Sequence, residues 1–193
     1  MSLLSLNRKN IGILVLEEFI GDLRSFMRAA CPQTDFPNTV YVRWQDPSKR
    51  GEDGIHMYYG RVLQKEYEVH LFSPPEALSR DFAVSDLQFP VRIYGSVLIM
   101  GSDVSFPGDQ ALYESVEKNP KVSALAWIRI HHLPFVIAAL NSSTSSSVSL
   151  EQLRYLLNLE AYVPIVSCPS EFDANHVDHL LSILIEQIEA GRD

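Results

Sequence analysis

Four short runs of this chain are mainly apolar, and each is bounded by polar or turn-forming residues. A run of four to eight apolar residues is typical of a strand that is buried on both faces of a parallel sheet. These runs lie at residues 11–16, 95–101, 133–140 and 163–167. They predict four buried strands, spread over most of the length of the chain.

Two further segments predict a β-hairpin. His56–Leu63 is followed, after Gln64-Lys65, by Glu66–Phe72, in which polar and apolar residues alternate. Alternation at period two is typical of a strand with one wetter face, and two strand-like segments this close together predict a hairpin. Before the hairpin, residues 32–53 are rich in Pro, Asp, Lys and Gly, which predicts a long loop. A short strand is expected within this loop at Val40–Trp44.

Helical periodicity separates these strands. Helices are predicted at residues 23–30, 109–118 and 121–131, after Ser149, and near Asp173. Ser149 and Gln152 have the spacing of a capping box, and Asp173 or Asn175 suits the N-cap of the final helix. The apolar stripe of that helix consists of Val177, Leu180, Leu181, Leu184 and Ile188.

Strands that alternate with helices indicate an α/β fold with helices on both faces of the sheet. We therefore expect a three-layer architecture with a mostly parallel six-stranded sheet, in which the hairpin places one antiparallel strand at an edge. The chain has 193 residues, of which 46% are apolar, and this is enough for one sizeable core. We expect a single domain over residues 1–193.

The charge of the chain argues against some classes of partner, and its cysteine content indicates a cellular compartment. Nine acidic and nine basic residues lie in residues 1–70, so the whole net charge of −8 falls in residues 71–193. An acidic chain without a Lys/Arg cluster argues against nucleic acid or an anionic membrane as partner. Cys31 and Cys168 give neither a disulfide framework nor zinc-site spacing, which fits a reducing cytoplasm. No apolar run is long enough to span a bilayer, so we expect a cytoplasmic protein without membrane insertion.

Four short motifs, taken in order, resemble one family. They are Tyr59-Gly60-Arg61, Leu71-Phe72-Ser73-Pro74-Pro75, Leu133-Pro134-Phe135-Val136-Ile137-Ala138 and Val163-Pro164-Ile165-Val166-Ser167-Cys168. Together with the order of elements, they resemble the bacterial Ras-like small GTPases related to the gliding-motility protein MglA. The resemblance runs from about residue 9 to residue 190. It implies a Ras-like G-domain fold of the P-loop NTPase type.

The resemblance also locates a phosphate-binding loop, and there this chain departs from the family. A P-loop uses glycine N–H groups, a Lys and a Ser or Thr to hold phosphates and magnesium. In register with the first strand, the positions of the first Gly, second Gly, Lys and Ser/Thr are held by Glu17, Asp22, Leu23 and Arg24, and Ser25 follows. Two carboxylates facing a polyphosphate would each cost about 1–4 kcal/mol at close range.

The other nucleotide motifs are altered as well. Ser73 stands at the second switch, where no Gly follows to contact a γ-phosphate. The base-reading motif keeps Asn141 but has Ser142 in place of its Lys and Thr144 in place of the Asp that recognises guanine. Ser167, in the last motif, is only partly in agreement with the family. Phosphate, magnesium and guanine positions are therefore all altered, while the strands between them stay similar.

These changes favour a pseudo-GTPase that neither hydrolyses nucleotide nor uses a cofactor or metal. Such a protein would act as a protein-interaction or regulatory scaffold. Residues 32–53 and 73–94, with the hairpin edge, correspond to the switch regions, which meet partners in the family. The resemblance suggests a roadblock- or longin-type protein, or a related GTPase, as that partner.

A second hypothesis is a nucleotide- or small-anion-binding protein, or a GTPase-related enzyme, with an altered phosphate site. Arg24, Ser25 and the serine-rich stretch 142–147 would then hold an anion at the N-terminus of the first helix. The same serine-rich composition is also typical of a solvated loop.

Cysteine and histidine residues offer two further interpretations. Cys168 with His176 or His179 could form a nucleophile–base pair, although a buried cysteine and two surface histidines fit the same pattern. His56 and His70 both lie on the predicted hairpin and could face each other. Two such residues are a weak signal for a metal site.

Overall fold

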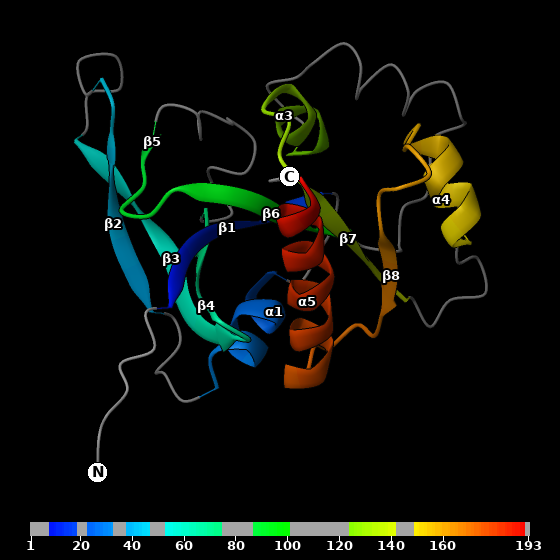
Figure 1. Cartoon of the computed structure of the whole chain (residues 1–193), viewed down its shortest axis with the longest axis horizontal. Coiled ribbons are helices and arrows are strands. Elements are labelled where there is room, and N and C mark those ends of the chain that lie inside the picture. The colour runs from blue at the N-terminus through cyan, green and yellow to red at the C-terminus, as the bar shows by residue number, and fades with distance from the viewer. Residues whose placement is uncertain are drawn as a thin grey trace.

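One mixed sheet organises the fold. The computed structural model describes residues 8–18, 23–32, 38–46, 53–74, 87–100, 124–141 and 149–191. The strands in these residues lie in the order β5-β2-β3-β4-β1-β6-β7-β8 (Figure 1). They are β1 (Lys9–Glu18), β2 (Thr39–Trp44), β3 (Gly54–Gln64), β4 (Tyr67–Ser73), β5 (Leu87–Gln88), β6 (Ile93–Met100), β7 (Phe135–Leu140) and β8 (Ile165–Cys168). The helices are α1 (Leu23–Ala30), α3 (Ala124–Ile130), α4 (Leu150–Leu156) and α5 (Ala174–Ala190).

The hairpin sits inside this sheet and not at its edge. β4, β1, β6, β7 and β8 are parallel to one another, whereas β3 is antiparallel both to β4 and to β2. The predicted α/β fold with a mixed, mostly parallel sheet is confirmed, as is the strand within the loop at 32–53. Two details of the prediction were wrong. The described sheet has eight strands and not six, and β3 is not an edge strand, because β2 and the two-residue β5 extend the sheet beyond it.

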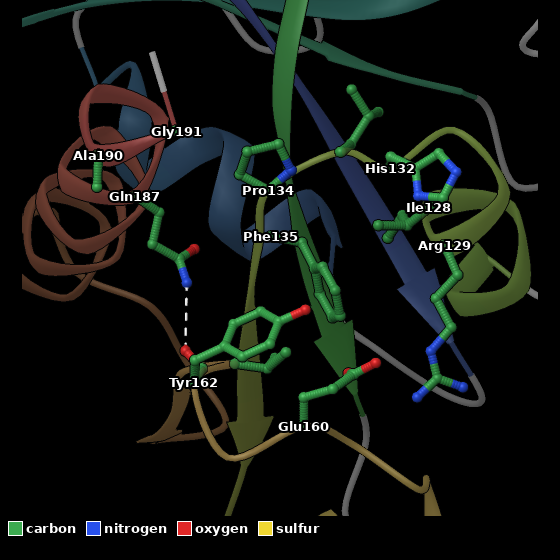
Figure 2. A pocket seen from close by; sticks show the side chains of 12 residues that line it. Ile128, Arg129, His132, Pro134, Phe135, Glu160, Tyr162, Gln187, Ala190 and Gly191 are labelled. Atoms are coloured by element: carbon green, nitrogen blue, oxygen red, sulfur yellow. Dashed lines mark hydrogen bonds between the residues drawn. The ribbon is translucent and has the colours of Figure 1, made fainter. Parts of the chain in front are cut away.

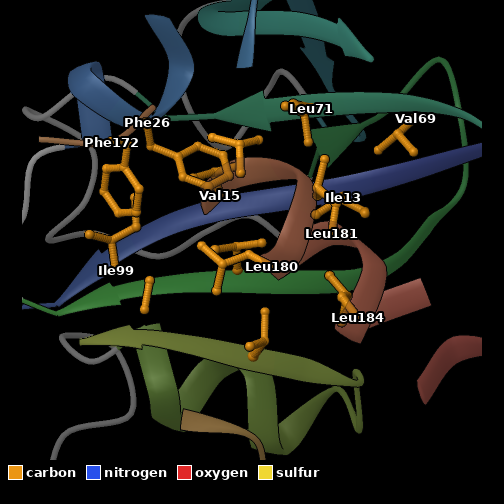
Figure 3. Packing of buried hydrophobic residues seen from close by; sticks show 14 of the residues in the cluster. Ile13, Val15, Phe26, Val69, Leu71, Ile99, Phe172, Leu180, Leu181 and Leu184 are labelled. Carbon is orange, nitrogen blue, oxygen red and sulfur yellow. The ribbon is translucent and has the colours of Figure 1, made fainter. Parts of the chain in front are cut away.

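Helices α1 and α5 cover one face of the sheet. Ile13 of β1 and Leu71 of β4 belong to one apolar cluster with Leu180, Leu181 and Leu184 of α5 (Figure 3). These five side chains are fully buried. Burial of each contributes about 1.5–3 kcal/mol relative to leaving it in water. The predicted apolar stripe of the final helix is therefore confirmed as the face that packs on the sheet.

Helices α3 and α4 belong to the opposite face. Leu14 and Leu16 of β1 alternate with the residues of the first cluster, as a strand with two buried faces requires. They share a second apolar cluster with Trp127 and Ile128 of α3 and with Leu153 of α4. The sheet is thus covered on both sides, which explains why its central strands read as continuous apolar runs.

The helix ends follow the local sequence signals. The bounds of α1 are those predicted, and α3 covers part of the helix predicted at 121–131. Ser149 and Gln152 form the expected capping box at the start of α4, and Asp173 caps α5 by accepting the His176 N–H at 2.9 Å. The helix predicted at 109–118 lies outside the described residues. None of the helices in the described segments combines the length and apolar character needed to cross a membrane.

The turn of the hairpin lies one residue later than predicted. Gln64 is the last residue of β3, and Lys65 adopts a positive φ of 52° in the turn. Gln64 is 5% exposed, and its side-chain Nε2 donates to the carbonyl oxygen of Asp178 on α5 at 3.3 Å. This buried contact holds Gln64 in the strand, so the chain reverses at Lys65-Glu66.

Candidate functional site

The carboxyl ends of the parallel strands bring several of the predicted site positions to one edge of the sheet. One row of the register contains Glu18, Met100, Ala139 and Ser167. Glu17 lies one residue before this row, and Asn141 follows β7 directly. Ligands of open α/β sheets bind at this edge, outside the carboxyl ends of the strands. The structure therefore groups Glu17, Asn141 and Ser167 where a ligand site of this fold is expected.

Asn141 and Ser167 are joined to each other. The Ser167 hydroxyl donates to Asn141 Oδ1 at 2.7 Å, and the Asn141 backbone N–H donates to the Cys168 carbonyl oxygen at 2.7 Å. These two bonds tie the end of β7 to the end of β8. Asn141 matches the nucleotide pattern and Ser167 matches it in part, and these two residues are thus hydrogen-bonded across the ends of neighbouring strands.

Leu23, which the resemblance places at the position of a P-loop Lys, packs in the core. Leu23 begins α1, is 5% exposed, and lies in the apolar cluster with Phe26 and Met27. The lysine of a P-loop reaches phosphate oxygens, whereas the Leu23 side chain packs under the helix in an apolar cluster. Arg24, the next residue, is exposed.

The Ser25 hydroxyl is already used to hold two segments together. The Phe172 backbone N–H donates to Ser25 Oγ at 3.1 Å. The rings of Phe26 and Phe172 meet edge to face, with centroids 5.2 Å apart and planes at 83°. The segment that follows β8 is therefore fixed on the first turn of α1.

Glu17 and Ser73 both belong to strands. Glu17 continues the alternation of Ile13 and Val15 and is half-buried near the end of β1, on the face covered by α1 and α5. Ser73, the last residue of β4, is fully buried, and its hydroxyl donates to the Pro74 carbonyl oxygen at 3.3 Å. Asp22, Thr144 and the serine-rich stretch 142–147 lie outside the described residues.

The structure does not join the cysteine and histidine residues of the nucleophile hypothesis. Cys168 is fully buried, and burial raises its pKa to about 11. Its Sγ donates to the Val166 carbonyl oxygen at 3.7 Å, and His176 lies beside Asp173, with Nδ1 2.6 Å from Oδ1. Among the described residues, no hydrogen bond connects Cys168 with His176 or His179. The thiolate needed for nucleophilic attack is disfavoured at this position.

The strand register does not bring His56 and His70 opposite each other, so it does not support a metal site on the hairpin. His56 pairs with Tyr41 of β2, whereas His70 pairs with Arg61, five residues further along β3. Within the described parts of the chain, no group of three or more His, Cys, Asp or Glu residues is placed to hold a metal ion.

A polar chain on β3, β4 and β1 was not predicted. Tyr59 Oη lies 2.8 Å from His70 Nδ1, and His70 Nε2 lies 3.1 Å from Asn10 Oδ1. Burial lowers the pKa of His70 and so favours the neutral ring. The contacts fit the tautomer in which Tyr59 donates to Nδ1 and Nε2–H donates to Asn10. Only the alternation of Glu68 and His70 with apolar residues signalled a polar strip here.

Comparison with known proteins supports the fold. No protein-family model matches the sequence, and no curated protein matches it. Among solved structures, the chain is similar to the cytosolic domain of the T. maritima FeoB iron transporter in apo form. The TM-score is 0.55 at 14% sequence identity, and the match covers 93% of this chain and 64% of that chain. At this identity the likeness shows the fold alone, an α/β fold with a mixed, mostly parallel sheet that resembles a GTPase G domain.

Proposed function

We propose that this chain is a G-domain-like scaffold that binds a protein partner and does not turn over a nucleotide. The burial of Leu23 in the core at the position of the P-loop Lys carries the proposal. A charged hydrogen bond of the kind lost there contributes about 1.5–3 kcal/mol. Glu17, at the first Gly position, adds a half-buried carboxylate to the same edge. Both changes weaken phosphate binding.

The β2 edge is the surface that we propose for the partner. Among the described strands, β5 pairs only with Arg43 and Trp44 of β2, so the segment Thr39–Val42 has a neighbour on one side only (Figure 1). Tyr41 is 45% exposed in this segment, and its ring centroid lies 5.1 Å from that of His56. An edge strand with an exposed aromatic side chain suits the addition of a partner strand. The family resemblance suggests a roadblock- or longin-type protein, or a related GTPase, in this role.

Titration of the full chain with nucleotides tests the loss of the phosphate site. Calorimetry with GTP, GDP and ATP, each with Mg²⁺, should show no binding at micromolar concentrations. Binding in the low micromolar range, which corresponds to about 8 kcal/mol, would contradict the proposal.

Calorimetric titration also tests the small-anion hypothesis. That hypothesis needs Arg24 and the Ser25 hydroxyl at the start of α1, and the Ser25 oxygen already accepts the Phe172 N–H. We expect inorganic phosphate to bind no better than sulfate. Selective phosphate binding that is lost in Arg24→Gln would favour the anion-binding protein instead.

A further inference from the structure

A cleft of about 680 Å³ lies at the amino ends of β7 and β8, the edge of the sheet opposite to Asn141 and Ser167. Its walls come from the ends of α3 and α5 and from the turn before β8, and Phe135 forms part of its floor (Figure 2). A volume of this size is within the range of small-molecule sites, which is about 300–1,000 Å³. No local sequence signal predicts this cleft, because its three walls are far apart along the chain.

Two side chains in these walls carry a buried polar atom with no hydrogen-bond partner among the described residues. They are Arg129 of α3, through Nε, and Gln187 of α5, through Oε1. The great majority of buried side-chain polar atoms in proteins do have a partner, so two exceptions in one cleft call for an explanation. One of them is a donor and the other an acceptor.

Other contacts orient both side chains. The Arg129 guanidinium donates to the carbonyl oxygens of Leu157 at 2.9 Å and Asn158 at 2.7 Å, just after α4. The Gln187 Nε2 donates to the Tyr162 carbonyl oxygen at 3.4 Å. Arg129 Nε–H and Gln187 Oε1 take no part in these hydrogen bonds. In the view of Figure 2, the two side chains lie on opposite sides of the Phe135 and Tyr162 rings.

The charges of the lining indicate an uncharged ligand. Arg129 and Glu160 contribute one positive and one negative charge, and most of the remaining lining is apolar or aromatic. The two unpartnered atoms are covered in this arrangement, so a ligand reaches them when a neighbouring side chain turns aside. Tyr162, whose carbonyl oxygen accepts the Gln187 Nε2–H, is 76% exposed in the same lining.

We propose that this cleft is a binding site for a small uncharged molecule, separate from the β2 edge and from the sheet edge at Asn141 and Ser167. This molecule has an aromatic or apolar body, with a hydrogen-bond acceptor at one end to pair with Arg129 Nε–H and an amide-type donor at the other end to pair with Gln187 Oε1. This inference does not depend on the proposed protein partner.

Heteronuclear NMR on the full ¹⁵N-labelled chain tests the site, because the Arg Nε–H and Gln side-chain amide signals are observed directly. Three probes share one body and differ in charge: N-acetylphenylalanine amide is neutral, N-acetylphenylalanine is an anion and phenylalanine amide is a cation. The neutral probe should give saturable shifts at Arg129 Nε–H and the Gln187 amide, with a dissociation constant at least about tenfold lower than those of the charged probes. Shifts that do not saturate, that fall elsewhere, or that are equal for all three probes would overturn the proposal.

Two variants locate the binding. Gln187→Leu removes the unpartnered acceptor together with the Nε2–Tyr162 hydrogen bond. It should weaken the neutral probe about tenfold, the effect of one neutral hydrogen bond, and lower the free energy of unfolding by no more than about 1.5 kcal/mol. Ala190→Phe places a ring in the cleft and should abolish binding. The matched control is Gln88→Leu, the same chemical change at an exposed residue of β5. Unchanged affinity in Gln187→Leu, or an equal loss in Gln88→Leu, would contradict the proposed site.

Discussion

Phe172 donates its backbone N–H to the hydroxyl of Ser25, 147 residues earlier in the chain, at 3.1 Å. The bond fixes the segment after β8 on the first turn of α1. The two segments also contact each other through the rings of Phe26 and Phe172, which meet edge to face.

Phe172→Ala should lower the free energy of unfolding by about 3–5 kcal/mol, because the Phe172 ring is 8% exposed and packs edge to face on Phe26. Urea unfolding followed by circular dichroism measures the change. Tyr155→Ala is the control, since Tyr155 is 83% exposed, and it should change stability by less than about 0.5 kcal/mol. Equal effects of the two substitutions would show that the packing of the Phe172 segment on α1 contributes little to the free energy of unfolding.

Leu23→Lys restores the residue type of a P-loop but should not restore nucleotide binding. The ammonium would enter an apolar cluster, so we expect a loss of about 3 kcal/mol or more in the free energy of unfolding. Leu23→Met, which conserves volume, should cost less than about 1.5 kcal/mol. Calorimetry with GTP and Mg²⁺ on folded Leu23→Lys is the second measurement. A gain of micromolar affinity would show that Leu23 sits over an otherwise intact phosphate site.

The stability of the fold should fall as the pH drops below about 6.5, in part because of His70. Burial holds the pKa of His70 below its ordinary value of 6.5, with Glu68 opposing and Arg61 reinforcing this effect. Below pH 6.5 the unfolded chain therefore takes up a proton that the folded chain does not, and unfolding is favoured until the pH falls below the folded-state pKa. Each pH unit between the two pKa values corresponds to about 1.4 kcal/mol.

Urea unfolding at pH 7.5 and at pH 5.5 measures the contribution of His70. The loss of stability between these two values should be smaller in His70→Asn than in the unmodified chain. The same loss in both proteins would assign the pH dependence to other groups. Asp173 is a separate case, because the His176 backbone N–H lowers its pKa below 3.8, so its contribution is lost only at lower pH.

Cys168 should be unreactive in the folded chain. Burial raises its pKa to about 11, so at pH 7.5 the thiol is almost wholly protonated as well as inaccessible. Iodoacetamide labelling followed by mass spectrometry should modify Cys168 in urea and leave it unmodified under native conditions. Rapid native labelling that is slowed by His176→Ala would instead support the nucleophile–base pair.

Local signals in the sequence predicted much of the fold. The capping box at Ser149, the N-cap at Asp173 and the bounds of α1 depend on residues within one or two helical turns, and all three were confirmed. The two-residue strand β5 was missed because it exists only through its pairing with Arg43 and Trp44, more than forty residues earlier. A segment that short carries no periodicity.

The candidate site was predicted less completely than the fold. The resemblance located Asn141 and Ser167, and the structure shows them bonded to each other. It did not indicate that Leu23 is buried or that Ser25 accepts the Phe172 N–H, because both depend on the packing of α1 against distant segments. The cleft between Arg129 and Gln187 has no local signal at all, because its walls meet only in the folded chain.

Affinity capture from the native cell with a matched pair of surface variants tests the proposed partner surface on β2 most directly. Tyr41→Asp changes an exposed tyrosine on the β2 edge, whereas Tyr155→Asp changes one on α4, at the other end of the sheet. The unmodified chain and Tyr155→Asp should retain the same partner protein, whereas Tyr41→Asp should retain at least about tenfold less of it while Tm is unchanged. A partner that Tyr41→Asp retains and Tyr155→Asp loses, or a preparation that carries stoichiometric nucleotide and no partner, would contradict the proposal.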